Sequence, residues 1–160
     1  MAYNGYLLKV NGTAFPMKYI VETSYVVSPD QRLDLESQRD ATGVLHRNVC
    51  EHMPVKIEFK TTPLTDSDVS EISRILSLDK SNRERTATVE YYNTETGGYA
   101  TAKCYVPNLE YTIDWIDNEK NTVHYNSTRY AFIEYWGGGG CIRRALRSMT
   151  RQWRTRRRVC

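Results

Sequence analysis

The sequence lacks the patterns by which most enzymes and membrane proteins are recognised. It contains no GxSxG, HExxH, Walker or GxGxxG motif, and only three of its 160 residues are histidine. It has no run of 18 apolar residues that could span a bilayer as a helix. Its first residues, MAYNGYLLKVNG, lack the basic and apolar stretches of a secretory signal. We therefore expect no catalytic site, no stable membrane anchor and no secretory leader.

Cysteine motifs are also missing. The four cysteines are scattered without CxxC spacing, at Cys50, Cys104, Cys141 and Cys160. This pattern argues against a disulfide scaffold or a zinc finger and fits assembly in a reducing cytoplasm. His46, Cys50 and His52 would share one face of an extended strand and are soft-metal ligands, but a fourth ligand is missing. We favour a buried Cys50 with two surface histidines, and we expect no metal and no cofactor.

Charge is unevenly distributed along the chain. The net charge is +3, but residues 141–160 hold 8 of the 22 Lys and Arg and no acidic residue. Residues 1–140 therefore carry 14 basic against 19 acidic residues, a net charge of −5. The chain is a mildly acidic body with a basic end, so any argument for nucleic-acid binding must be confined to that end.

Composition divides the chain into three parts. The four glycines of residues 137–140 predict a flexible linker between a β-domain, residues 1–136, and a basic extension, residues 141–160. Ile142, Leu146, Met149 and Trp153 fall at helical spacing in this extension and predict an amphipathic helix. Its candidate phosphate-binding residues are Arg143, Arg144, Arg147, Arg151, Arg154, Arg156, Arg157 and Arg158.

The most informative stretch runs from Gln31 to Phe59 and predicts one long β-hairpin. Leu33 and Leu35 alternate with polar residues, Asp40-Ala41-Thr42-Gly43 is a turn sequence, and the chain would return as far as Phe59. Two strands alone are marginal in water, so we expect this arm to dock on a neighbouring subunit. An ordinary solvated hairpin is the alternative. The candidate contact residues are Arg32, Asp34, Glu36, Arg39, Asp40, Gly43, His46 and Arg47.

The remaining patterns predict short strands and one helix. Thr65 and Asp68 form a capping signal, and an apolar stripe predicts a helix over residues 65–78. Alternating runs predict strands elsewhere, among them 109–115 and one continuous last strand over 122–135. The expected fold is mainly β with one α-helix, a β-sandwich or barrel with the helix packed on its side.

Several of these segments together resemble small uncharacterised proteins from the tail modules of long-tailed bacteriophages and prophages. The segments are YLLKVNGTAFP, RDATGVLHRNV, VKIEF, the capped helix after PLT, and VEYYNTETGGY. The order of strands, hairpin arm, strand, helix and strands is also similar to the tail-tube fold of tube, distal tail and tail-completion proteins. The resemblance covers about residues 1–135. The linker and Arg-rich end have no place in it and could be a natural extension, a read-through end or an engineered addition.

The resemblance implies a structural protein of the virion tail, assembled in the host bacterial cytoplasm, with no catalysis. It implies copies of the chain in a ring, usually a hexamer, in the tail tube or its distal baseplate end, next to other tail proteins. DNA would pass through the lumen without specific binding, which the acidic body permits. Two alternatives remain at this point. One is a β-domain that recognises a protein or carbohydrate through its tyrosine-rich faces, and the other is nucleic-acid or membrane binding through the basic end.

Overall fold

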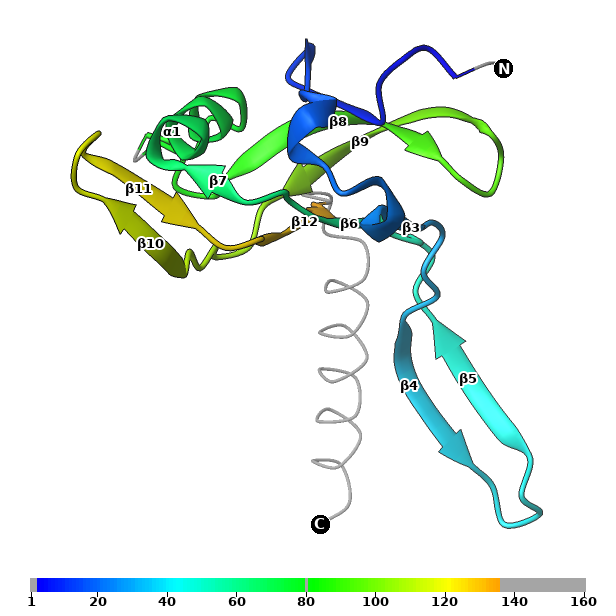
Figure 1. The fold of residues 1–160 in the computed structure, drawn as a ribbon. Coiled ribbons are helices and arrows are strands. Elements are labelled where there is room, and N and C mark those ends of the chain that lie inside the picture. Colours follow the sequence, from blue (N-terminus) through cyan, green and yellow to red (C-terminus); the bar gives the residue numbers. More distant parts are fainter. Residues whose placement is uncertain (1–2, 80, 136–160) are drawn as a thin grey trace. The chain divides into compact units, whose positions relative to one another are not determined.

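The structure is a computed structural model that describes residues 3–79 and 81–135 (Figure 1). These residues divide into two compact units, which we call the body, residues 3–29 and 55–135, and the hairpin unit, residues 30–54. Each unit is described separately below. No helix among the described residues is long and apolar enough to cross a membrane. The predicted linker and basic extension lie outside the described residues.

A seven-stranded antiparallel sheet forms most of the body. Its strand order is β2-β1-β8-β9-β12-β6-β3, an open arrangement rather than a closed barrel. The strands are β1 (Leu8–Val10), β2 (Thr13–Ala14), β3 (Val26–Ser28), β6 (Lys56–Lys60), β8 (Thr86–Asn93), β9 (Gly98–Tyr105) and β12 (Arg129–Glu134).

A smaller three-stranded sheet and one α-helix complete the body. The sheet has the order β10-β11-β7, from β10 (Ile113–Asp117), β11 (Thr122–Tyr125) and β7 (Leu64–Thr65). Helix α1 (Asp66–Ile75) packs beside β7 and β11 (Figure 1). Two short 3-10 turns, η1 (Met17–Tyr19) and η2 (Glu22–Ser24), connect β2 to β3. The predicted class, mainly β with one α-helix, is confirmed in the part of the chain that the structure describes.

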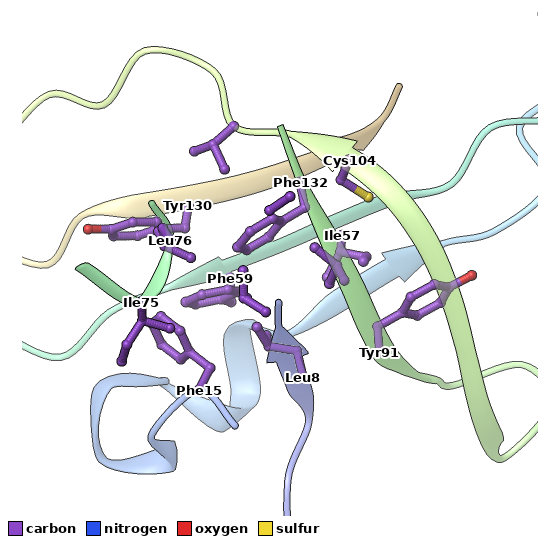
Figure 2. Close-up of a cluster of buried hydrophobic side chains, with 14 of the residues drawn as sticks. Leu8, Phe15, Ile57, Phe59, Ile75, Leu76, Tyr91, Cys104, Tyr130 and Phe132 are labelled. Atoms are coloured by element: carbon purple, nitrogen blue, oxygen red, sulfur yellow. The ribbon is translucent and has the colours of Figure 1, made fainter. Parts of the chain in front are cut away.

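Alternation along the strands of the large sheet places one face in the core. Ile57 and Phe59 point inward from β6, as do Tyr130 and Phe132 from β12. The Phe59 ring stacks on Tyr130 with centroids 5.7 Å apart (Figure 2). The buried Tyr130 hydroxyl lies 2.6 Å from that of Tyr111, so this polar atom keeps a hydrogen-bond partner inside the core. Aromatic contacts between two neighbouring strands thus form the centre of the body.

Helix α1 begins as the sequence predicts. Thr65 is its N-cap, and Thr65 and Asp68 form a complete capping box, each side chain accepting from the other residue's backbone N–H. The Tyr19 hydroxyl donates to Asp68 at 2.9 Å and so attaches η1 to the first helical turn. The fully buried Ile72 lies on the inner face of the helix. The start of the helix is therefore stabilised by local and long-range hydrogen bonds together.

The helix ends three residues earlier than the expected Leu78. Ser77 adopts a positive φ of 51°, and its N–H bonds the carbonyl of Arg74 at 3.2 Å. The Leu78 N–H bonds the carbonyl of Ser73 at 3.0 Å. These two bonds make a Schellman ending, in which a residue in the left-handed region reverses the chain. Serine rather than glycine holds that position, which explains why the sequence gives little warning of it.

Two strand predictions are wrong. The expected last strand over residues 122–135 is two strands, β11 and β12, in different sheets. The break falls at Ser127 and Thr128, because the Thr128 N–H bonds Thr61 Oγ1 at 3.0 Å and the Ser127 hydroxyl bonds the Thr61 carbonyl at 2.6 Å. The expected strand over 109–115 begins only at Ile113, where β10 pairs with β11.

The long hairpin is also shorter than predicted. It ends at Val49, and β6 is not its returning strand, since β6 pairs with β12 and β3 of the large sheet. Periodicity cannot distinguish the two cases, because alternation gives the face of a strand but not its pairing partner.

Candidate interaction surfaces

The hairpin unit is a two-stranded antiparallel ribbon of β4 (Asp34–Arg39) and β5 (Leu45–Val49) (Figure 1). Its turn is the predicted Asp40-Ala41-Thr42-Gly43, and Gly43 supplies the positive φ of 84° that the turn requires. The Asp40 carboxylate accepts hydrogen bonds from the Thr42 hydroxyl at 2.6 Å and the Thr42 and Val44 N–H groups at 2.9 and 3.0 Å. It also lies 2.9 Å from His46 Nε2. These bonds fix the turn.

The same network changes the acidity of Asp40. The pKa of Asp40 is lowered to about 2. The hydrogen bond from the Thr42 hydroxyl is the largest cause of this shift, and the contact with His46 is the second largest. Each bond is made to the ionised form, so the charged carboxylate is favoured. The turn is therefore held by a group that stays ionised in all but strongly acidic solution.

A second charged contact joins the two strands of the hairpin. Arg47 donates to Asp34 through Nη2 at 2.7 Å and Nε at 3.1 Å, and this hydrogen bonding lowers the pKa of the Asp34 carboxyl. Arg39 donates through Nη1 to the Gly43 carbonyl at 2.8 Å. Both arginines are among the residues predicted to contact a neighbouring subunit. Arg47 already has a carboxylate partner within its own hairpin, whereas Arg39 has none among the described residues.

The ribbon is exposed along most of its length. Every residue from Arg32 to Asn48 is exposed, including all eight predicted contact residues. The exposed set also includes the large apolar side chains Leu33, Leu35, Val44 and Leu45. Leu33 and Leu35 lie at the end of the ribbon away from the turn, and Val44 and Leu45 adjoin the turn, so each end presents two exposed apolar side chains. The contact residues predicted from the sequence did not include these apolar side chains.

A second exposed apolar strand lies in the body and was not anticipated. Strand β10 is at one end of the three-stranded sheet, and β11 is its one partner among the described strands. Its side chains Ile113, Trp115 and Ile116 are 53%, 51% and 52% exposed. The Trp115 ring stacks on His124 with centroids 4.1 Å apart, so its orientation is fixed. The adjacent apolar pair Trp115-Ile116, which breaks the alternation of a half-buried strand, is the sequence signal that could have indicated this surface.

The cysteine and histidine residues considered as metal ligands do not form a metal site in the described part of the chain. The residues of this part hold no group of three His, Cys, Asp or Glu side chains arranged to bind a metal ion. Within the candidate set of His46, Cys50 and His52, His46 contacts Asp40. Cys50 is half-buried rather than fully buried as expected. Cys104 is buried as a free thiol, and burial raises the pKa of this thiol to about 12.

The tyrosines that suggested a recognition surface are mostly engaged with one another. The Tyr6 and Tyr99 rings lie 4.7 Å apart, and the Tyr99 hydroxyl donates to the Tyr6 carbonyl at 2.8 Å. The Tyr25 hydroxyl donates to the carbonyls of Leu7 and Tyr92 at 3.3 and 3.2 Å. These contacts hold β8, β9 and the N-terminal segment together. The arginines of the predicted basic extension lie outside the described residues.

Comparison with known proteins gives one family and one distant structural likeness. The family described as "Family of unknown function (DUF6711)" matches residues 1–135. No curated protein matches. A solved structure titled "Virion of native gene transfer agent (GTA) particle" contains a chain similar to this one at 14% identity and a TM-score of 0.46. The match covers 85% of this chain and 96% of that chain, and a likeness at this level carries no conclusion about function.

Proposed function

The chain belongs to the family of unknown function DUF6711, and we propose that it is a structural subunit of a bacteriophage tail. In this role it forms a ring, sixfold as in similar tail proteins, in or at the distal end of the tail tube. Its partners are other copies of the chain and neighbouring tail proteins. It is assembled in the host cytoplasm, functions in the virion and catalyses no reaction.

The exposed hairpin is the observation that carries this proposal. A ribbon exposed from Arg32 to Asn48 makes no hydrophobic core of its own, yet it is ordered by the Asp40 turn and the Asp34–Arg47 pair. A solvated two-stranded ribbon is marginally stable by itself, so the ordered hairpin does not add to the stability of a monomer. It is useful for assembly, since a prefolded surface loses less conformational freedom when it binds.

The open edges of the body support the same role. Strand β10 exposes three large apolar side chains at the end of its sheet. Monomeric proteins usually protect such edges with charges, proline or a covering segment, because unpaired strands associate. A subunit whose edges become interfaces in a ring does not need that protection.

Charge supports the passage of DNA without specific binding. Residues 1–140 carry a net charge of −5. A lumen lined by an acidic subunit repels phosphate and leaves DNA free to slide. The tyrosine-rich faces do not favour the alternative of a carbohydrate-binding module, because the Tyr25 and Tyr99 hydroxyls bond backbone groups within the fold.

Electron microscopy of the purified full-length chain tests the proposal directly. We expect closed rings with sixfold symmetry and an open centre, stacked or single. The ring population should increase with protein concentration. A chain that stays monomeric at every concentration and salt condition would contradict the proposal.

A further inference from the structure

Two of the outer strand edges among the described residues, those of β4 and β10, have matching properties, and one lies in each unit. Among the described strands, β4 of the hairpin pairs only with β5, and β10 of the body pairs only with β11. The other edge of each strand is therefore free of strand partners in the part of the chain that the structure describes. The two strands are also similar in length, six residues in β4 and five in β10.

Both edges carry exposed apolar side chains. Leu35 lies within β4 and Leu33 immediately precedes it, and both are about half exposed. On the other strand, Ile113 and Ile116 are exposed to a similar extent. Strand addition would satisfy the free backbone groups of both edges and would cover these side chains at the same time.

Arg39 and the β10–β11 ribbon carry opposite charges. In residues 32–48 three arginines balance Asp34, Glu36 and Asp40 when His46 is neutral, so the net charge of the hairpin is zero. Asp34 pairs with Arg47, and Asp40 accepts hydrogen bonds within its own turn. Arg32, Arg39 and Glu36 have no ionic partner among the described residues. The β10–β11 ribbon contains Asp114, Asp117 and Glu119 against one lysine, a net charge of −2. Asp114 is the second of the five residues of β10 and is exposed.

We infer that strand β4 of one copy adds to the free edge of β10 in the next copy, with Arg39 facing the acidic β10 edge. The occupant of β10 is thus a second copy of this chain. The contact is heterologous, because it joins two different surfaces, so repetition produces a ring or an open filament rather than a closed dimer. This inference deepens the proposed ring and rests on it for the number of subunits only.

Two assembly-blocked variants of the full-length chain test the contact. The hairpin variant carries Leu33→Lys and Leu35→Lys, and the strand variant carries Ile113→Lys and Ile116→Lys. All four positions are exposed, so both variants should fold, which circular dichroism and thermal unfolding verify. Each variant alone should be monomeric in analytical ultracentrifugation. Their mixture should form a species of twice the single-chain mass and nothing larger, since it retains one usable pair of edges.

Matched controls place the same number of lysines outside the proposed edges. Ala41→Lys with Asn48→Lys changes the turn and β5, and Thr112→Lys with Asn118→Lys flanks β10. All four of these positions are also exposed. Both control variants should assemble like the unmodified chain, which separates an edge effect from a general effect of added charge.

Charge reversal gives a second readout. Arg39→Glu should weaken association at least tenfold, and Asp114→Lys in the same chain should restore most of it. The restoration should diminish as salt concentration increases, because exposed charge pairs are screened.

The outcomes separate this contact from others and from the ring itself. Dimers of the hairpin variant alone would indicate β10–β10 pairing, and dimers of the strand variant alone would indicate pairing between hairpins. Either result overturns the inference, as does a monomeric unmodified chain. Rings from the unmodified chain without a mixed dimer leave the proposed function standing and reject this contact. If the mixture gives a dimer but the unmodified chain forms open filaments instead of rings, the contact is supported and the proposed ring is rejected.

Discussion

Asp34 and Arg47 form a two-pronged contact across the hairpin, with the Arg47 Nη2 atom 2.7 Å and its Nε atom 3.1 Å from Asp34 Oδ1. Both residues come from strands that are exposed on both faces, so no core holds these strands in place. The pair therefore stabilises the pairing of β4 with β5 by a local cross-strand contact. It also explains why Arg47 is a weaker candidate than Arg39 for a contact with a neighbouring subunit.

Replacing Arg47 should loosen the hairpin and leave the body unchanged. In Arg47→Ala the ribbon loses this cross-strand contact, so amide hydrogens of β4 and β5 should exchange faster while those of β6 and β12 do not. Arg47→Lys is the matched control, because lysine keeps the charge but cannot donate in the fork geometry. It should give an intermediate effect. Equal exchange in all three proteins would show that the pair does not order the ribbon.

The turn should be insensitive to pH until strongly acidic solution. The pKa of Asp40 is lowered to about 2 from the ordinary value of 3.8, mainly by the Thr42 hydroxyl. A depressed carboxyl pKa contributes stability that is fully present above 3.8 and is lost as the pH falls through about 2. NMR titration should therefore show the Asp40 carboxyl and the Thr42 amide changing together in a transition centred near pH 2. In Asp40→Asn the Thr42 amide should lose this transition.

Shortening the hairpin should abolish assembly without unfolding the body. A chain in which residues 39–47 are replaced by Asn-Gly retains every strand of both body sheets. It loses Arg39, the turn and the β5 residues Leu45 to Arg47. We expect a folded monomer in light scattering, with cooperative thermal unfolding like that of the full chain. Normal rings from this deletion, or a product without cooperative unfolding, would contradict the assembly role of the hairpin.

The helix should be sensitive on its buried face only. Ile72 and Leu76 are fully buried, so changing either to alanine leaves a cavity and should cost about 2–5 kcal/mol of unfolding free energy. Ser70→Ala, on the exposed face of the same helix, should change stability by less than about 0.5 kcal/mol. Denaturant titration of the three variants measures the difference. Similar midpoints for Ile72→Ala and Ser70→Ala would mean that the helix does not pack as described.

Ser77→Gly should stabilise the protein. Ser77 ends α1 at a φ of 51°, where an L-residue with a Cβ atom is strained and glycine is not. The expected gain is about 1 kcal/mol or less, because glycine also increases the freedom of the unfolded chain. Ser77→Ala keeps the Cβ atom and should bring no gain. Thermal unfolding of both variants checks this, and a destabilised Ser77→Gly would show that the Ser77 side chain contributes more than its backbone strain costs.

Local features were predictable from the sequence, and long-range ones were not. The hairpin turn at Asp40–Gly43 and the capping box at Thr65 and Asp68 each depend on residues within four positions of one another, and both occur as expected. The division of the last strand depends on hydrogen bonds between Thr61 and Thr128, which are far apart in the sequence. No pattern within residues 122–135 contains that information.

The candidate surfaces follow the same rule. The polar turn and half-apolar strands indicate an exposed hairpin, and the eight predicted contact residues are exposed. Their contact with a neighbouring subunit stays a prediction. The exposure of the β10 edge was not predicted, because isoleucine and tryptophan, the residue types at Ile113 and Trp115, are usually buried. Whether such residues are buried depends on which strands flank them, and this is a property of the sheet order rather than of the local sequence.

The position of β12 has a consequence for the order in which the protein can form during synthesis. This strand is the last of the described chain, yet it lies between β9 and β6 near the middle of the seven-stranded sheet and supplies Tyr130 and Phe132 to the core. Until Glu134 has left the ribosome, β6 with β3 and β8 with β9 cannot join into one sheet, and Phe59 has no Tyr130 to stack on. The hairpin, whose contacts are all local, can form much earlier. In a nascent chain the hairpin would thus be folded while the seven-stranded sheet is still incomplete. The time at which β12 completes this sheet would then determine when the body of one copy can bind the hairpin of the next.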